Sequence, residues 1–335
     1  MYEADKDRYA AMEYSRCGKS GLVLPRVSLG LWHNFGSVDD FQNAQKMIFK
    51  AFDLGIIHFD IANNYGPEPG SAETNFGKIY SENLKKYRDE IVVSSKAGYL
   101  MWDGPYGNWG SRKSLIASCD QSLKRTQLEY FDIFYHHRPD PETPIEESML
   151  ALDSIVRSGK ALYIGISNYD PEGALQAFKI LNELKTPGVI YQGSFNMLNR
   201  TQETSGMLEL LQKLGKGMIC FSPLAQGLLS SKYLNGIPEN SRASRNHFLK
   251  AETITPDLVE KISKLNALAK RRNQTLSQMA ISWVLSKKGV TSALFGASNT
   301  NQVEEIALAA KRTSFSEDEY EEIDSVVFSK FKYTR

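Results

Sequence analysis

The feature that most constrains the fold is a regular alternation of short apolar runs with longer segments of helical spacing. Eight runs rich in Val, Ile and Phe follow one another along the chain, at residues 27–31, 56–61, 91–96, 131–136, 161–166, 189–195, 216–223 and 290–296. Each run has the length of a strand and is apolar on both faces, which is typical of a parallel sheet covered by helices. The alternation therefore predicts an α/β protein.

The segments between the runs predict the covering helices. Between the first two runs, Phe41, Ala44, Ile48 and Phe52 repeat at helical spacing, and Gly55 follows as a C-cap. Similar patterns occur at residues 111–123, 145–156, 171–184, 203–214 and 302–310. Eight strands favour a closed (β/α)8 TIM barrel over an open doubly wound sheet, because no G-x-G-x-x-G phosphate-binding turn follows the first strand.

We expect a single domain over residues 1–335, with additions to the barrel. The expected parts are a hairpin that plugs the bottom of the barrel (about 12–24), the barrel (about 27–311), extra helices between strands seven and eight starting near Asp257 and Leu276, and a C-terminal helix (about 316–328). The polar stretch 226–255 before these extra helices is long for a compact domain, which indicates a functional loop.

Charge and composition narrow the function classes. The net charge of +1 lacks the basic footprint of a nucleic-acid binder, so we expect a small-molecule partner. Cys17, Cys119 and Cys220 lie far apart without a CxxC pair, which argues against a disulfide framework and against a metal site. The N-terminus has no apolar leader, and no apolar stretch approaches the length of about 18 residues that a membrane span needs. A cytoplasmic protein without a membrane segment is expected.

Polar side chains stand where the second, third and fourth strands end. The second strand closes with Asp60 and is followed by Tyr65, the third ends with Lys96, and the fourth ends with His136 and His137. Because the carboxyl ends of the strands form the active-site face of a (β/α)8 barrel, we expect these side chains to share one site.

These residue types fit proton donation to a carbonyl oxygen. A phenol is too weak an acid at neutral pH, but a neighbouring ammonium such as that of Lys96 would stabilise the phenolate and lower the pKa of Tyr65. Asp60 would hold the lysine charged and would thereby gain the partner that a buried carboxylate needs. His137 could orient the carbonyl oxygen. Nicotinamide supplies the hydride that such a reduction requires, so we expect a dinucleotide site that is not of the Rossmann type.

At these residues the sequence resembles the aldo-keto reductase superfamily, from about Met12 to Phe328. Stretches such as GLWHNFG and KYLNGIP look closest to the bacterial branch of L-glyceraldehyde 3-phosphate reductases, which is similar to the potassium-channel β subunits. The matching motifs are Phe59-Asp60-x-Ala62-x-x-Tyr65-Gly66, Ser95-Lys96, His137-Arg138-Pro139-Asp140, Gly165-Ile166-Ser167-Asn168, Phe221-Ser222-Pro223-Leu224 and Leu294-Phe295-Gly296-Ala297-Ser298.

The resemblance implies a catalytic tetrad. Tyr65 takes the position of the general acid, Lys96 lowers its pKa, Asp60 pairs with Lys96, and a histidine shapes the carbonyl site. The Arg-Pro pair that follows His137 aligns that histidine with the position of the family's catalytic histidine. His136 lies one residue inside the strand, so its side chain is expected to point to the opposite face.

The resemblance also implies an NADPH site. Residues after strand five and in strand six match those that hold the carboxamide, an aromatic residue stacks on the nicotinamide, and the loops after strands seven and eight bind the pyrophosphate, the adenosine and the 2′-phosphate. The implied cofactor contacts are Gly30, Trp32, Ser167, Asn168, Gln192, Phe221, Ser222, Pro223, Leu224, Gln226, Lys232, Arg242, Gly296, Ser298, Gln302 and Glu305. Two positions depart from relatives: Ile306 replaces an asparagine that contacts the adenine, and Asn299 stands where a basic residue can lie.

The implied activity is the NADPH-dependent reduction of small aldehydes, such as L-glyceraldehyde 3-phosphate or methylglyoxal, to alcohols. Pocket residues are expected to be Trp32, His33, Trp102, Tyr106 and Arg138; Arg138 either binds a substrate phosphate or holds its loop. Relatives imply a homo-tetramer or a larger homo-oligomer.

Two other functions remain open at this point. One is an NADPH-binding regulatory subunit of the channel-β kind, although those relatives carry asparagine at the position of His137. The other is a class I aldolase with a Schiff base on Lys96.

Overall fold

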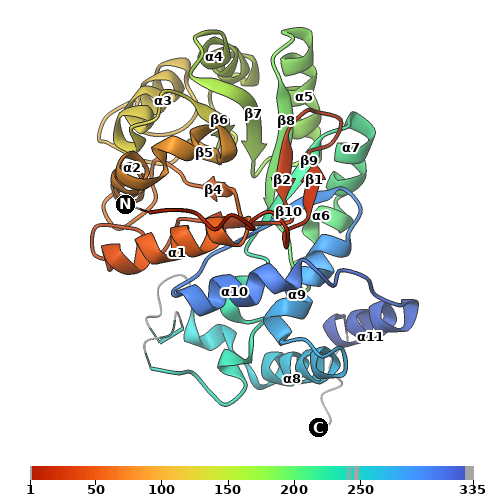
Figure 1. Cartoon of the computed structure of the whole chain (residues 1–335). Helices are drawn as coiled ribbons and strands as arrows, with labels where there is room; N and C mark the ends of the chain where they lie inside the picture. The colour runs from red at the N-terminus through yellow and green to blue at the C-terminus, as the bar shows by residue number, and fades with distance from the viewer. Residues whose placement is uncertain (1, 240, 242, 245–248, 329–335) are drawn as a thin grey trace.

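Eight parallel strands at the centre of the molecule form a closed barrel (Figure 1). The computed structural model describes residues 2–239, 241, 243–244 and 249–328. Around the barrel the strands follow in the order β10-β3-β4-β5-β6-β7-β8-β9. Their bounds are Val27–Gly30 (β3), His58–Asp60 (β4), Val92–Ala97 (β5), Phe131–His136 (β6), Ala161–Ser167 (β7), Gly188–Ser194 (β8), Gly217–Phe221 (β9) and Val290–Phe295 (β10). The predicted (β/α)8 barrel is confirmed, with its strands at the expected places.

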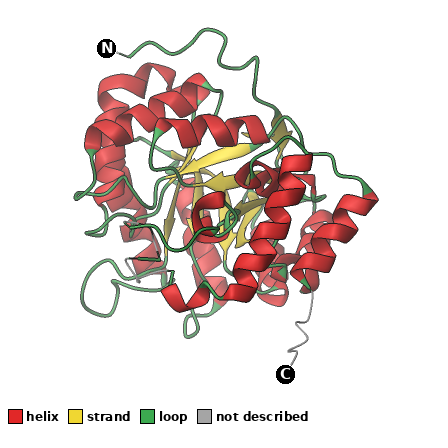
Figure 2. Ribbon diagram, turned by 90° about the horizontal axis from the view of Figure 1, so that it is seen from below, coloured by secondary structure: helices red, strands yellow, loops and turns green. Residues whose placement is uncertain are grey.

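Two hydrophobic cores hold the barrel, one outside the strands and one inside them. The outer core lies between strands and helices and includes Leu29, Phe59 and Trp283, which are fully buried. The inner core includes Ile133 and Ile190. Figure 2 shows the strands at the centre with helices around them. This arrangement is why the strands are apolar on both faces.

Most of the described α-helices begin at a residue whose side chain caps the first turn. Asp40 accepts hydrogen bonds from the N–H groups of Gln42 and Asn43, and Thr275 forms a capping box with Gln278. The helices are α1 (Phe41–Asp53), α2 (Ser71–Ile79), α3 (Arg112–Thr126), α4 (Ile145–Arg157), α5 (Pro171–Glu183), α6 (Thr201–Thr204), α7 (Met207–Leu214), α8 (Pro256–Arg271), α9 (Leu276–Ser286), α10 (Thr300–Ala309) and α11 (Glu317–Val327).

A hairpin closes the N-terminal end of the barrel. Its strands, β1 (Tyr14–Arg16) and β2 (Val23–Pro25), pair antiparallel. Leu22 and Leu24 pack with the inner core of the barrel, and the N–H of Lys19 donates to the carbonyl of Gly215 at 2.8 Å. The predicted plug is therefore confirmed.

Two segments differ from the predicted helices. The predicted helix 203–214 is two helices, α6 and α7, because Gly206 between them adopts φ 80°, a left-handed conformation that ends a helix. The segment between β4 and β5, for which no helix is predicted, forms α2, a π-helical turn (Tyr80–Leu84) and a 3-10 segment (Lys85–Glu90). Helix α2 starts after Gly70 without a side-chain cap, so the usual start signal is missing from its sequence.

The connection from β9 to β10 is the longest in the barrel. Its described residues form three short 3-10 turns, Ala225–Gly227, Ser231–Tyr233 and Ala251–Thr253, before α8 and α9. The two helices confirm the predicted starts near Asp257 and Leu276. Among the described residues, no helix has the length and the apolar character needed to cross a membrane.

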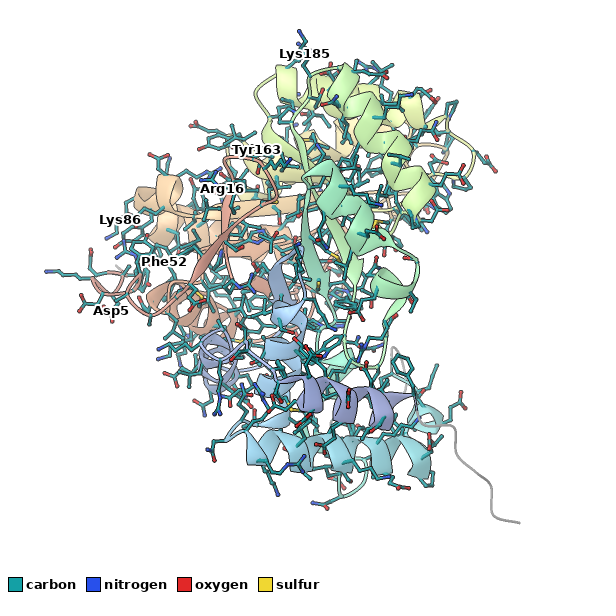
Figure 3. All side chains as sticks on the ribbon, turned by 90° about the vertical axis from the view of Figure 1, so that its right-hand side faces the viewer. Asp5, Arg16, Phe52, Lys86, Tyr163 and Lys185 are labelled. Atoms are coloured by element: carbon teal, nitrogen blue, oxygen red, sulfur yellow. The ribbon has the colours of Figure 1, made fainter. Side chains whose placement is uncertain are left out.

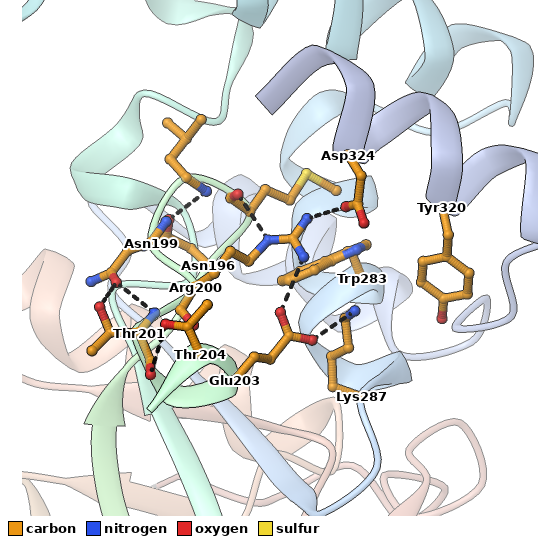
Figure 4. A network of polar contacts seen from close by, with 12 residues as sticks. Asn196, Asn199, Arg200, Thr201, Glu203, Thr204, Trp283, Lys287, Tyr320 and Asp324 are labelled. Carbon is orange, nitrogen blue, oxygen red and sulfur yellow. Dashed lines mark hydrogen bonds and ion pairs between the residues drawn. The ribbon is translucent and has the colours of Figure 1, made fainter. Parts of the chain in front are cut away.

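A polar network fixes the C-terminal helix, which occupies its predicted place (Figure 4). Arg200, 7% exposed, donates to the carboxylate of Asp324 in α11 at 2.7 Å and to that of Glu203 at 3.1 Å. The Arg200 guanidinium lies 4.0 Å from the ring centroid of Trp283, and Lys287 pairs with Glu203 at 2.9 Å. The network joins α6, α9 and α11.

The N-terminal segment lies across α1 and the 3-10 segment before β5. Tyr2 stacks on Phe49 at 4.0 Å, and Lys86 pairs with Glu3 at 2.5 Å. In Figure 3, Asp5 and Lys86 lie on the same side of the molecule. These contacts tie the segment to the outside of the barrel, away from the strand ends that carry the predicted site.

Candidate active site

Asp60, Lys96 and Tyr65 meet at the carboxyl ends of β4 and β5. Asp60 is the last residue of β4 and pairs in the sheet with Ser94, so Lys96 lies one side-chain step further along the same face. The Lys96 Nζ atom lies 2.5 Å from Asp60 Oδ2 and 3.3 Å from the Tyr65 hydroxyl. Asp60 and Lys96 are both fully buried. The sheet register therefore brings the three predicted residues within hydrogen-bond reach.

All three N–H bonds of the Lys96 ammonium have an acceptor. Besides Asp60 and Tyr65, Nζ donates to the carbonyl oxygen of Ile61 at 2.7 Å. Because an ammonium donates and never accepts, the Tyr65 oxygen is the acceptor of this contact. The hydroxyl hydrogen of Tyr65 must then point away from Lys96.

Burial shifts the pKa values of this group. It lowers the pKa of Lys96, which Asp60 opposes, and it raises the pKa of Tyr65 well above its usual value, with Asp60 adding to the rise. The direction for Tyr65 differs from the sequence expectation, because loss of hydration disfavours the phenolate more than the ammonium favours it. Tyr65 is therefore a protonated phenol in the free protein.

His137 lies beside Tyr65 at the end of β6. The two ring centroids are 5.9 Å apart, and Tyr99 packs edge-on against His137 at 4.6 Å. Burial and the charges of Lys96 and Arg138 hold the pKa of His137 well below its usual value. At neutral pH this side chain is a neutral imidazole, with one N–H to donate.

His136 points to the outside of the barrel, as the sequence predicts. Its Nδ1 atom is 2.6 Å from the Tyr169 hydroxyl. A Cβ atom on Gly110 would approach His136 Nε2 to 2.2 Å, so only glycine fits the chain at that point. His136 is thus part of the packing between the barrel and its helices, one layer away from Tyr65.

The residues predicted to hold a carboxamide surround the tetrad. Gln192 donates from Nε2 to Asp60 Oδ1 at 3.2 Å, a contact that cannot be predicted from the sequence. Asn168 donates from Nδ2 to the carbonyl of His137 at 3.0 Å and to the Ser167 hydroxyl at 3.2 Å. Gly30 is next to Asp60 in the sheet. The structure therefore brings these residues to the same strand ends as the tetrad.

Backbone conformations of higher energy cluster on the rim after β7 and β9. Asn168, Ser222, Ala225 and Gln226 have φ angles of 62°, 52°, 46° and 60°. Non-glycine residues adopt such angles rarely, and mostly at functional sites. The carbonyl oxygen of the Gln226 side chain is buried and has no hydrogen-bond partner among the described residues. A buried acceptor without a partner, in a loop with strained backbone angles, is compatible with a loop that contacts a polar ligand such as a dinucleotide.

The other residues of this rim vary in exposure. Phe221 and Leu224 are partly exposed, Pro223 between them is buried, and Lys232 is exposed. Asn196 donates from Nδ2 to the carbonyl of Ser222 at 2.9 Å, which holds the rim to the end of β8. The predicted contact Arg242 lies outside the described residues.

Helix α10 begins at the rim after β10. Gln302 accepts through Oε1 from the N–H of Ser298 at 2.9 Å, and the N–H of Gln302 donates to Asn299 Oδ1 at 3.0 Å. Asn299 is therefore the N-cap of α10. Gly296 and Ser298 are exposed, whereas Ile306 is buried in the core. Glu305 accepts from the Thr275 hydroxyl at 2.6 Å, so this predicted ligand is engaged with the cap of α9.

Of the aromatic residues predicted to line the pocket, Trp32 packs near Tyr65. The Trp32 ring lies 4.1 Å from His33 and 6.2 Å from Tyr65, and 37% of Trp32 is exposed. Tyr106 packs near the Lys113 ammonium of α3, at 4.5 Å. Trp102 is partly exposed in the same loop. Within the described part of the chain, Tyr106 makes no ring contact or hydrogen bond with the tetrad.

Arg138 holds the loop that follows β5. Its guanidinium lies 3.6 Å from the Trp109 ring centroid and 4.2 Å from that of Tyr99. It donates from Nε to the carbonyl of Gly98 and from Nη2 to Asn108 Oδ1, both at 2.9 Å. These contacts favour the loop-holding role that the sequence left open.

Four polar residues below the tetrad were not predicted. Ser28, His58, Ser94 and Ser292 are fully buried inside the barrel. His58 and Ser94 precede Asp60 and Lys96 by two positions, so they share the same face of their strands. That spacing is the signal that could have found them. Among the described residues, no group of three or more His, Cys, Asp or Glu side chains is placed to hold a metal ion.

Comparisons with known proteins identify the family of the chain. The profile of the aldo/keto reductase family matches residues 26–327. The chain is 53% identical over 329 residues to the L-glyceraldehyde 3-phosphate reductase of Escherichia coli (strain K12), which covers 97% of this chain and 95% of that protein. It is 33% identical over 330 residues to a probable voltage-gated potassium channel subunit beta of Oryza sativa subsp. japonica, which covers 96% of this chain and 99% of that protein. The chain thus belongs to the aldo/keto reductase family of oxidoreductases, which use nicotinamide cofactors.

Proposed function

We propose that the protein reduces small aldehydes to alcohols with NADPH, and that Tyr65 is the proton donor. The observation that carries the proposal is the contact of the Tyr65 hydroxyl with Lys96 Nζ at 3.3 Å, next to the Lys96–Asp60 ion pair at 2.5 Å. This arrangement directs the hydroxyl hydrogen away from the ammonium. A substrate carbonyl oxygen beside Tyr65 would therefore accept from a hydroxyl group whose O–H bond is already oriented away from Lys96.

NADPH, when bound, supplies a hydride to the carbonyl carbon. Tyr65 then gives its proton to the alkoxide oxygen, and the Lys96 ammonium stabilises the phenolate that remains. The raised pKa of Tyr65 is compatible with this role, because an alkoxide is a stronger base than a phenolate and takes the proton even from a weak phenol. The same raised pKa keeps Tyr65 protonated between turnovers.

His137 would orient the substrate carbonyl. Its low pKa makes it a neutral imidazole, which can donate one N–H to the carbonyl oxygen and does not compete with Tyr65 as an acid. The ring packs between Tyr65 and Tyr99, so its position is fixed before a substrate arrives.

The cofactor would lie along the rim of the strand ends. Ser167, Asn168 and Gln192 are suited to hold the carboxamide, and Phe221 offers an aromatic face to the nicotinamide. The strained rim and the start of α10 would hold the phosphates and the adenosine through Trp32, Ser222, Pro223, Leu224, Gln226, Lys232, Arg242, Gly296, Ser298, Gln302 and Glu305. The orphaned oxygen of Gln226 is the observation that best supports a ligand at this rim.

The substrate class is proposed from the relatives and from the Trp32 ring beside Tyr65. Small aldehydes such as L-glyceraldehyde 3-phosphate and methylglyoxal are the first candidates, because the first of them appears in the name of a protein 53% identical to this chain. We extend the proposal to a cytoplasmic homo-tetramer or larger homo-oligomer, which sedimentation of the purified protein would test.

The test is NADPH oxidation by the purified protein with L-glyceraldehyde 3-phosphate, methylglyoxal and nitrobenzaldehyde. Tyr65→Phe should lower kcat by about 10²-fold or more with unchanged NADPH affinity, because it removes only the proton donor. Tyr163→Phe, which changes a tyrosine at the hairpin end of the barrel, is the matched control and should keep kcat. Full activity of Tyr65→Phe would refute the acid assignment.

Two further outcomes would replace the proposal. Tight NADPH binding without turnover on any aldehyde would favour the regulatory subunit. Trapping of a lysine adduct by borohydride without nicotinamide would favour the aldolase, although the three acceptors around Lys96 Nζ leave no free amine for a Schiff base.

A further inference from the structure

A continuous line of buried side chains runs across the barrel interior from β10 to Asp60. Ser292 Oγ lies 2.7 Å from Ser28 Oγ, which lies 2.9 Å from His58 Nδ1. His58 Nε2 lies 3.0 Å from Ser94 Oγ, and Ser94 Oγ lies 2.6 Å from Asp60 Oδ1. The five residues come from four neighbouring strands, β10, β3, β4 and β5, and all are fully buried.

The direction of each hydrogen bond follows from its neighbour. Asp60 is paired with Lys96 and only accepts hydrogen bonds, so Ser94 must donate its single hydroxyl hydrogen to Asp60. Ser94 can then only accept from His58, which requires the hydrogen on His58 Nε2. Burial lowers the pKa of His58 to about 4, so the ring is neutral and its Nδ1 atom accepts from Ser28. Ser28 in turn accepts from Ser292, and every donor in the line points towards Asp60.

We propose that His58 is a positioning residue for the reduction, which fixes through Ser94 the orientation of the Asp60 carboxylate. Oδ1 of that carboxylate is held by Ser94 and Gln192, which leaves Oδ2 for Lys96. The position of the ammonium decides in turn whether it reaches Tyr65. The inference rests on the proposed function, because it assigns a role in the same proton donation.

The opposite half of the barrel interior argues against a purely structural role. There, strands β6, β8 and β9 fill the same interior with Ile133, Ile190 and Ile219. Apolar side chains are therefore compatible with the interior of this barrel. Buried polar side chains usually make folding less favourable than apolar side chains do, unless each polar group has a hydrogen-bond partner. The line from Ser292 to Asp60 satisfies each of its members and ends on the ion pair.

The test compares two amides at position 58 in the full-length protein. His58→Gln can place its amide N–H near the position of His58 Nε2 and keep the bond to Ser94, whereas His58→Asn reaches only the side of Ser28. We expect kcat to fall by about 10-fold in His58→Asn and in Ser94→Ala, and to stay within about 3-fold in His58→Gln. The aldehyde KM and the NADPH Kd should change by less than about 2-fold. Ile190→Val controls for the lost volume and should keep kcat.

A second readout does not depend on activity. Nitrogen-15 NMR of the histidine-labelled protein should find the His58 ring neutral with its hydrogen on Nε2 at pH 7. Equal kcat losses in His58→Gln and His58→Asn, or a hydrogen on Nδ1, would overturn the inference. If instead the wild-type protein reduced no aldehyde, or Tyr65→Phe kept full activity, the proposed function would fail, while the NMR result would still report on the hydrogen-bond line.

Discussion

Replacement of Asp60 by asparagine tests how much the buried ion pair with Lys96 contributes to stability and to activity. Asp60 and Lys96 are fully buried and 2.5 Å apart, so Asp60→Asn leaves an ammonium without its counter-charge in a dry environment. Breaking a buried pair on one side typically costs about 3–5 kcal/mol, against about 0–1 kcal/mol for a pair at the surface. We therefore expect the free energy of unfolding at pH 7 to fall by about 3 kcal/mol or more.

The loss should depend on pH in a defined direction. Burial already lowers the pKa of Lys96, and Asp60 is the main group that raises it, so the variant lowers it further. At pH values between the pKa of Lys96 in the folded variant and its pKa of about 10.4 in the unfolded chain, the unfolded state binds more protons than the folded state. The free energy of unfolding of Asp60→Asn should accordingly rise with pH in this interval, and its deficit against the wild type should be larger at pH 6 than at pH 9.

Urea unfolding followed by circular dichroism measures the stability. NADPH oxidation measures kcat, which should fall by about 10²-fold because Lys96 loses the carboxylate that holds its charged ammonium beside the Tyr65 oxygen. Glu209→Gln, which breaks the exposed pair with Lys213, is the matched control and should leave both quantities unchanged. A stability loss in Asp60→Asn no larger than that of a surface pair, with intact turnover, would refute the reasoning.

Three further predictions concern other parts of the molecule. Arg138 donates hydrogen bonds to Gly98 and Asn108 and so holds the loop after β5. Arg138→Gln should therefore raise the KM for L-glyceraldehyde 3-phosphate and for glyceraldehyde by a similar factor, about 10-fold. A rise in KM for the phosphorylated substrate alone would instead identify a phosphate contact. His58 and His136 have pKa values of about 4 in the folded protein, below the unfolded value of about 6.5, so the folded state binds fewer protons between these values. The free energy of unfolding should therefore fall as the pH drops from about 6.5 to 4, by about 3 kcal/mol for each histidine. An unchanged pH slope in His58→Gln would contradict this. Arg200→Met should lower the free energy of unfolding by about 2 kcal/mol and expose α11 to proteases, whereas a resistant α11 in limited proteolysis would show that the link to Asp324 is not needed.

The placement of the tetrad could be predicted from the sequence because it follows from strand order. Asp60 and Lys96 end neighbouring strands, and the carboxyl ends of parallel strands meet at one face whatever the details of packing. His137 could be separated from His136 by the alternation of side chains along a strand, and the contact of His136 with Tyr169 on the outer side confirms that separation.

Contacts across the barrel could not be predicted in the same way. Gln192 lies 132 residues from Asp60 in the chain, and only closure of the barrel brings their side chains together. Ser28 and Ser292 are small residues whose burial gives no signal in a single sequence. Helix α2 was missed because its N-cap is a glycine in a left-handed conformation and not a capping side chain. The direction of the Tyr65 pKa was missed because the extent of its burial is a tertiary property.

The two halves of the barrel interior should differ in how much sequence variation they accept. On the side of β6, β8 and β9, Ile133, Ile190 and Ile219 can exchange for other aliphatic residues of similar volume at small cost. On the side of β10, β3, β4 and β5, each single substitution leaves a buried polar group without its hydrogen-bond partner. Substitutions on this side are therefore tolerated only when both hydrogen-bond partners change together. A directed-evolution library that randomises this interior would recover single substitutions from one wall and paired substitutions from the other.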